Sequence, residues 1–188
     1  MSVAAPTVLV LPGWQNSGPE HWQSRWQAAH PHWRRVEQAD WLHPRRADWV
    51  ATLDAAAEAV PGQLVLLAHS LGCVTVAHWA ATAPAAAARV RHAFLVASPD
   101  VERADLPAEL ADFAPAPRAP LPFPATLVAS RDDPYCRFER AQALAADWQA
   151  ASWDVGTAGH VNADAGFGDW PEGHARLMSV LDGEPHAG

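Results

Sequence analysis

The stretch Gln63-Leu64-Val65-Leu66-Leu67-Ala68-His69-Ser70-Leu71-Gly72 decides the fold of this chain. Its first half is a short apolar run after the turn pair Pro61-Gly62, which is typical of a strand buried on both faces. Ser70 stands where that strand should end, and an apolar stretch at helical spacing follows it up to Pro84. A serine on a sharp turn from strand to helix is the nucleophile-elbow pattern, which strains the backbone and exposes the hydroxyl.

The residues on either side of Ser70 suit such a turn. Strand and helix approach so closely there that the residues two before and two after the serine must be small. Ala68 and Gly72 satisfy this requirement, although Ala68 replaces the glycine that is usual at its position. The alternative interpretation is a turn in which Ser70 only caps the following helix.

Short apolar runs alternate with helix-like segments along the rest of the chain. Strands are expected over 7–11, 33–38, 63–67, 93–97, 125–129 and 152–155, with the polar 33–38 strand at a sheet edge. Helices are expected over 20–29, 46–59, 73–80, 137–149 and 172–182, with a short one near 106–112. The helical spacing of the first places Trp22, Trp26 and Ala29 on one buried face. This alternation predicts one α/β domain over 1–188, a mostly parallel six-stranded sheet with helices on both faces, and a frayed tail over 183–188.

The composition excludes several classes of protein. The formal net charge of −8 argues against nucleic acid as a partner, because phosphate binding needs a basic face. Cys73 and Cys136 are too few for a disulfide scaffold or a cysteine metal site. We see no signal peptide, and no apolar stretch approaches the roughly 20 residues of a membrane span. We therefore expect a soluble cytoplasmic protein with no membrane partner.

The segments that carry polar residues follow the ends of different strands. Residues 12–16 follow the first expected strand, Ser70 the third, residues 130–136 the fifth and His160 the sixth. Functional residues in parallel sheets gather at the carboxyl ends of the strands. All four segments should therefore lie on one rim of the sheet.

Ser70, Asp133 and His160 are the candidate catalytic residues. A serine hydroxyl needs a base to take its proton, and the base needs a third group that holds its tautomer. In this type of fold the order along the chain is serine, acid, histidine, which these three residues obey. The other nine histidines lie before the serine, next to it, in helices, at the wrong side of a strand or in the tail. Otherwise, His160 would be a loop histidine that caps the final helix.

Three aspartates compete for the role of the acid. Asp133 is favoured because the small residue Ser130 stands three positions before it, as is usual in an acid turn. Asp132 is adjacent, so its side chain should diverge from that of Asp133. Asp100 remains a rival, because it follows the fourth strand on the same rim. The aspartates that are not the acid would stabilise turns.

An oxyanion hole needs two N–H donors. One is expected from Leu71, the residue after the nucleophile, and the other from the loop after an early strand. In that loop Trp14 is the first choice and Gln15 the second. Trp14 is also a candidate for a pocket wall or for the core.

Four motifs occur in a characteristic order. They are Pro12-Gly13-Trp14, Ala68-His69-Ser70-Leu71-Gly72-Cys73, Ser130-Arg131-Asp132-Asp133-Pro134-Tyr135-Cys136, and Gly159-His160-Val161-Asn162 before Trp170-Pro171-Glu172-Gly173. Over about residues 5–182 the chain resembles the small α/β-hydrolases related to retinoblastoma-binding protein nine, the YdeN-like serine hydrolases. The resemblance implies a minimal α/β-hydrolase fold without a large lid and a triad of Ser70, Asp133 and His160, and leaves the substrate open.

These residues together predict a serine hydrolase, most simply a carboxylesterase, that cleaves small acyl esters through an acyl-enzyme and needs no metal or organic cofactor. Residues 101–124 are too short for a large lid, so short soluble esters are expected over long-chain lipids. An amidase, peptidase or thioesterase on the same triad is the alternative, as is a binding protein on a hydrolase fold. A doubly wound phosphate-binding protein would need a glycine-rich phosphate loop after the first strand, and none is present. The sequence names no protein partner.

Overall fold

The computed structural model describes residues 5–183, which contain a six-stranded sheet with only parallel pairings. Its order is β2-β1-β3-β4-β5-β6. The strands are β1 (Thr7–Leu11), β2 (Arg34–Arg35), β3 (Leu64–His69), β4 (Val90–Val96), β5 (Ala125–Ala129) and β6 (Ala151–Asp154). The predicted six-stranded α/β architecture is confirmed. The expected tail lies, beyond Gly183, outside the described residues.

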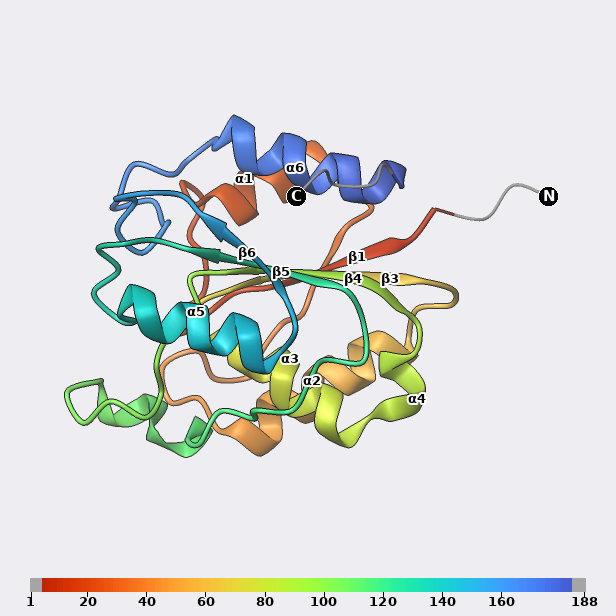
Figure 1. Cartoon of the computed structure of the whole chain (residues 1–188). Helices are drawn as coiled ribbons and strands as arrows, with labels where there is room; N and C mark the ends of the chain where they lie inside the picture. The colour runs from red at the N-terminus through yellow and green to blue at the C-terminus, as the bar shows by residue number, and fades with distance from the viewer. Residues whose placement is uncertain (1–4, 184–188) are drawn as a thin grey trace.

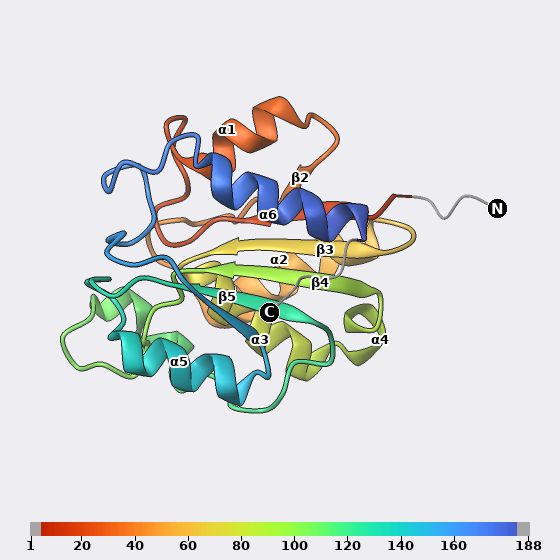
Figure 2. The ribbon, with the colours of Figure 1, turned by 45° about the horizontal axis from the view of Figure 1, so that its top comes forward.

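Helices cover both faces of this sheet (Figures 1 and 2). One face carries α1 (Trp22–Ala29) and α6 (Pro171–Asp182). The other carries α2 (Arg46–Glu58), α3 (Leu71–Thr82), α4 (Pro84–Ala87) and α5 (Phe138–Asp147), with a 3-10 helix η1 (Ala108–Phe113) beyond them. In the described part of the chain, no helix is long and apolar enough to cross a membrane.

Strand β3 lies at the centre of the hydrophobic core, and all six of its residues are buried. Because successive side chains of a strand point to opposite faces, β3 contributes to two separate apolar clusters. Leu64, Leu66 and Ala68 pack toward α2 and α3. Val65 and Leu67 pack toward α1 and α6, where tryptophans fill much of the space. The prediction of a central strand buried on both faces is confirmed.

The main differences from the predicted elements lie at their ends. The strand expected over 33–38 pairs only at Arg34–Arg35, on the edge of the sheet, where it has a single neighbour. The helix expected from residue 20 begins at Trp22, because His21 has extended backbone and caps it. Ala29, which the helical spacing places with the buried tryptophans, is exposed. The alanine-rich segment after α3 forms the short helix α4, where no element is expected from the sequence.

The end of β1 and the start of α3 approach each other very closely. A Cβ atom added to Gly72 would lie 2.5 Å from the carbonyl oxygen of Leu11, and one added to Gly13 would lie 2.7 Å from the Cβ of Ser70. These two glycines therefore allow the turn at Ser70 to pack against the loop that follows β1. Ala68 is fully buried on the other side of the turn, so a methyl group fits where many such elbows have glycine.

Two buried histidines are in contact, His21 at the N-terminus of α1 and His69 at the end of β3. His21 is 6% exposed, and its Nδ1 accepts a hydrogen bond from the N–H of Gln23 in the first turn of the helix. Its ring contacts that of His69 edge to face, with 4.6 Å between the centroids. Burial, with smaller effects of His160 and Arg35, lowers the pKa of His21 to about 3. Burial also lowers the pKa of His69 well below its ordinary value.

Replacing Gly72 with alanine presses a methyl group against a backbone carbonyl that cannot move independently of β1. We expect this change to lower the free energy of unfolding by about 1–3 kcal/mol. The matched control is Gly18→Ala, because a Cβ at Gly18 meets nothing within 4 Å; its effect should stay within about 1 kcal/mol. Urea unfolding followed by tryptophan fluorescence measures both, and equal stabilities would contradict the close approach.

His21 should make the protein sensitive to acid. Its folded pKa of about 3 lies below the unfolded value of 6.5, so its contribution to stability is complete above pH 6.5 and is lost as the pH falls toward 3. His21→Asn keeps a good helix cap and removes this titration. Between pH 7 and pH 4.5, the wild type should lose on the order of 2 kcal/mol more unfolding free energy than His21→Asn. The exposed His32→Asn is the control, and it should follow the wild type.

Candidate active site

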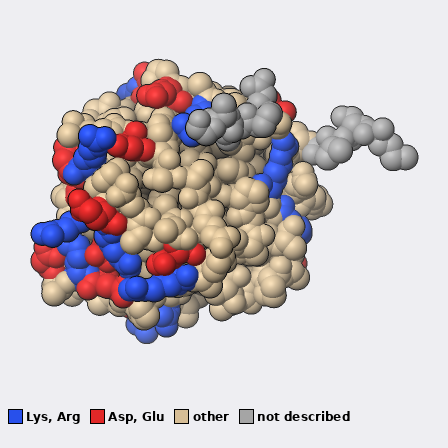
Figure 3. Space-filling view, viewed as in Figure 1, with Lys and Arg blue, Asp and Glu red and all other residues tan. Residues whose placement is uncertain are grey.

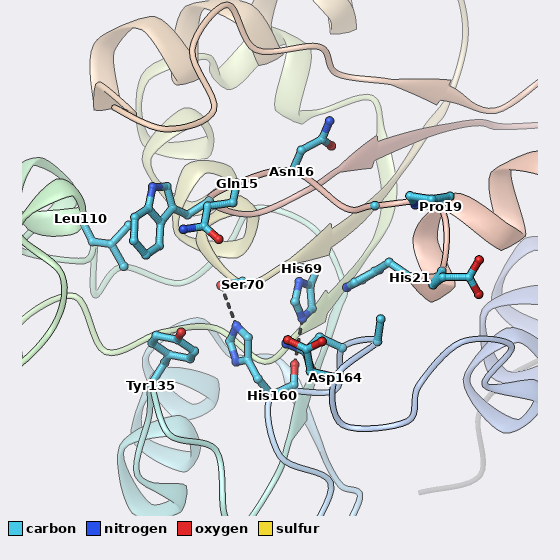
Figure 4. A pocket seen from close by; sticks show the side chains of 15 residues that line it. Gln15, Asn16, Pro19, His21, His69, Ser70, Leu110, Tyr135, His160 and Asp164 are labelled. Carbon is cyan, nitrogen blue, oxygen red and sulfur yellow. Dashed lines mark hydrogen bonds between the residues drawn. The ribbon is translucent and has the colours of Figure 1, made fainter.

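The turn after β3 and the loop after β6 bring Ser70 and His160 together (Figure 4). Ser70 has a φ of 52°, a strained left-handed value for a residue other than glycine. The Ser70 hydroxyl lies 2.9 Å from Nε2 of His160, so it can donate its proton to that nitrogen. The other ring nitrogen, Nδ1, lies 3.0 Å from both carboxylate oxygens of Asp133. These contacts form a continuous hydrogen-bond chain from Asp133 through His160 to Ser70.

The carboxylate of Asp133 is well shielded from solvent. The Asp133 side chain is 3% exposed and the His160 side chain 9% exposed. The N–H of Tyr135 donates a further hydrogen bond to Asp133 at 2.9 Å, and the ring of Tyr135 lies 4.5 Å from that of His160. A buried carboxylate on Nδ1 holds the tautomer that leaves Nε2 free to accept the serine proton.

The other two aspartates that compete for this position point elsewhere. Asp132 accepts hydrogen bonds from the Ser130 hydroxyl and from the N–H of Gly159, each at 2.8 Å. Asp100 pairs with Arg140, which also binds Glu102. On the face shown in Figure 3, arginine and carboxylate side chains lie close together toward the left. Of the three candidates, the structure brings only Asp133 to His160.

The two N–H groups predicted to hold an oxyanion lie in different segments, Trp14 in the loop after β1 and Leu71 at the start of α3. No hydrogen bond joins the N–H of Trp14 or of Leu71 to another described residue. The N–H of Gln15, the second choice for an oxyanion donor, already donates to the carbonyl of Trp41 at 3.0 Å. The Trp14 indole donates to the carbonyl of Leu42. Trp14 and Leu71 are therefore the two N–H groups of the predicted set that stay available.

A cavity of about 330 Å³ opens above Ser70 and has two different sides (Figure 4). Leu110 and Tyr135 lie on one side, and the polar side chains of His21 and Asp164 lie on the other. Trp14 also lines the cavity. Residues 101–124 contribute only Leu110 of η1 to this lining.

Several residues of the site carry no clear signal in the sequence. His69 lines the cavity, and its Nε2–H donates to the backbone carbonyl of His160 at 2.9 Å, although the two residues are 91 positions apart. His21 lines the same cavity from α1. Only Gly13 has a local signal, the Pro-Gly turn directly after the first strand.

Neither cysteine is a reactive nucleophile. Burial raises the pKa of the Cys136 thiol to about 12 and that of the Cys73 thiol beyond this, so both stay protonated at neutral pH. Among the residues that the structure describes, no group of three or more histidine, cysteine or carboxylate side chains could hold a metal ion.

Comparison with solved structures finds proteins of similar fold. A YdeN-like hydrolase from Pectobacterium atrosepticum is 31% identical, with a TM-score of 0.84 over 95% of this chain and 91% of that one. The ydeN gene product of Bacillus subtilis is 23% identical, with a TM-score of 0.77 over 94% and 99% of the two chains. The carboxylesterase CesB of Bacillus subtilis shares the fold at 17% identity, with a TM-score of 0.62 over 97% and 85%.

Comparison with known sequences gives a family as well. No curated protein matches the chain. The model of the serine hydrolase family, however, matches residues 8–179, which include every candidate residue of the site. The match extends over most of the chain, and the 31% identical relative is a hydrolase of the YdeN-like type that the four motifs resemble. This chain therefore belongs to the serine hydrolase family and is a small α/β-hydrolase of the YdeN-like type.

Proposed function

We propose that the chain is a carboxylesterase of small acyl esters in which Ser70 is the nucleophile, His160 the base and Asp133 the acid. The observation that carries this proposal is the hydrogen-bond chain from Asp133 through His160 to Ser70 beside an open cavity. The strained turn at Ser70 supports it, because strain at a functional turn persists only where the surrounding structure holds it.

In the first half of the reaction, Oγ of Ser70 attacks the ester carbonyl while its proton passes to Nε2 of His160. The N–H groups of Leu71 and Trp14 donate hydrogen bonds to the oxyanion of the tetrahedral intermediate. The loss of one such donor typically costs about 2.7–4 kcal/mol of transition-state stabilisation. His160 then returns the proton to the leaving oxygen as the carbon–oxygen bond breaks, which leaves an alcohol and an acyl group on Ser70.

In the second half, a water molecule enters after the alcohol has left. His160 takes a proton from this water as its oxygen attacks the acyl carbonyl, and the same donors hold the second oxyanion. The tetrahedral intermediate collapses, the carboxylic acid departs, and the proton returns to Oγ of Ser70. Asp133 keeps its charge throughout and stabilises the imidazolium in both halves.

The dimensions of the site favour small substrates. The cavity of about 330 Å³ takes a short acyl chain on its apolar side, against Trp14, Leu110 and Tyr135. A single 3-10 helix, Ala108–Phe113, supplies the rim from the segment between β4 and β5. An amide or thioester could enter the same cavity, but no contact in the site favours either over an ester.

The triad assignment predicts a specific ranking of variants in p-nitrophenyl acetate hydrolysis. Ser70→Ala and His160→Ala should lower kcat/KM by at least about 10⁴-fold, because either change removes the nucleophile–base unit. Asp133→Asn should lower it by about 10³–10⁴-fold, because the tautomer is no longer held. Asp100→Asn is the matched control and should stay within about threefold of the wild type, since the Asp100 carboxylate pairs with Arg140 and makes no hydrogen bond to His160. An Asp100→Asn variant that is as slow as Asp133→Asn would contradict the assignment.

The small cavity predicts a preference for short acyl chains. In a series of p-nitrophenyl esters with one leaving group, acetate and butyrate should have a kcat/KM at least about tenfold above that of palmitate, because remote acyl carbons find no apolar wall to contact. All esters are measured in the same detergent below its critical micelle concentration. A palmitate rate equal to or above the butyrate rate would show that the described cavity does not bound the acyl chain.

A further inference from the structure

Four consecutive residues around His160 are each held by a side chain from another part of the fold. The two N–H groups at the start of this loop donate to side-chain oxygens, and the two carbonyls at its end accept from ring nitrogens. The four contacts are Ala158 N–H to Ser130 Oγ at 2.9 Å, Gly159 N–H to Asp132 Oδ1 at 2.8 Å, His69 Nε2 to His160 O at 2.9 Å, and Trp22 Nε1 to Val161 O at 2.7 Å.

The backbone of this loop needs such support. Gly159 has a φ of 54° and Val161 a φ of 46°, so the residues on both sides of His160 are left-handed. This conformation is accessible to glycine but is strained for a β-branched residue such as Val161. Strained backbone persists only where the surrounding structure over-determines it. The four side-chain contacts hold the loop from outside, beside the hydrogen bond from the N–H of Val161 to the carbonyl of Ala158 and the burial of Val161 in the core.

Asp132 connects this loop to the turn that binds the His160 ring. The same Oδ1 accepts from the Ser130 hydroxyl and from the N–H of Gly159. Ser130 is buried, and its oxygen in turn accepts the N–H of Ala158. The next residue after Asp132 is Asp133, which binds the ring of His160. One short turn therefore holds both the backbone before His160 and its imidazole.

We propose that Asp132, through Ser130 and the N–H of Gly159, is a positioning residue that sets where the His160 ring lies between Ser70 and Asp133. The proposal rests on the proposed function of Ser70, His160 and Asp133. Nε2 of His160 must reach Ser70 while Nδ1 stays on Asp133, and a displacement of about 1 Å in such a site can cost about 10²-fold in rate. Asp132 makes no hydrogen bond to the His160 ring, so it acts only through the loop.

Two substitutions of Asp132 separate a hydrogen-bonding role from a role of its charge. Asp132→Ala and Asp132→Asn both remove the negative charge, but only the asparagine keeps an oxygen that can accept from Gly159 and Ser130. With p-nitrophenyl acetate, Asp132→Ala should lower kcat by about 10–100-fold with KM within about twofold of the wild type. Asp132→Asn should stay within about threefold of the wild type in both.

The matched control is Asp154→Ala. Asp154 is an exposed aspartate in the same region, where it accepts from the N–H of Gly156 at 2.8 Å and pairs with Arg131. In the described structure its carboxylate makes no hydrogen bond to residues 158–161. Asp154→Ala should keep the wild-type kcat. Thermal unfolding of all variants checks that they are folded under the assay conditions.

A second readout does not depend on turnover. The proton on Nδ1 of His160, shared with Asp133, should give a far-downfield signal in the proton NMR spectrum of the wild type, absent from His160→Ala. This signal should persist in Asp132→Asn and broaden or vanish in Asp132→Ala, because the ring is no longer held in place.

Three outcomes would overturn the proposal. The first is an Asp132→Ala variant with wild-type kcat and an unchanged downfield signal. The second is that Asp132→Ala and Asp132→Asn are equally slow. The third is an Asp154→Ala variant that is as slow as Asp132→Ala. If the wild type itself does not hydrolyse the ester, the proposed function fails, and the downfield signal alone still tests whether Asp132 positions His160.

Discussion

The close approach of the turn at Ser70 to the loop after β1 is the constraint on which the site depends. Ser70 can adopt its left-handed backbone only because Gly72 packs against the end of β1 and Gly13 packs against Ser70 itself. The same approach brings the loop that carries the free N–H of Trp14 beside the turn that carries the free N–H of Leu71. Packing between the ends of two neighbouring strands therefore determines both the backbone of Ser70 and the position of these two N–H groups.

Parallel strands extend this arrangement to the rest of the site. Because β1, β3, β5 and β6 run in the same direction, the segments after them meet on one rim of the sheet. The acid turn after β5 and the histidine loop after β6 are adjacent there, and their strands pair directly. This explains why two neighbouring aspartates can have different partners. Asp133 contacts the imidazole, and Asp132 contacts the backbone of the loop that carries it.

Much of the fold and of the candidate site follows from local sequence patterns. The buried run before Ser70, the order of serine, acid and histidine, and the small residue three positions before Asp133 are patterns that can be recognised without three-dimensional information. Contacts between distant residues could not be predicted in this way. Trp22 reaches the carbonyl of Val161 from a helix 139 positions earlier, and nothing in either segment signals the pairing. Ala29 was expected to be buried but is exposed, because helical spacing alone does not show at which residue a short helix stops packing against the core.

The most informative single measurement is the mass of the protein after reaction with a fluorophosphonate, followed by mapping of the modified peptide. A serine activated by His160 and Asp133 should displace fluoride and gain one phosphonyl group, located on Ser70. The same reagent should leave His160→Ala unmodified, although its Ser70 is intact. Modification of another residue, or no modification of folded wild-type protein, would contradict the assignment of Ser70 as an activated nucleophile.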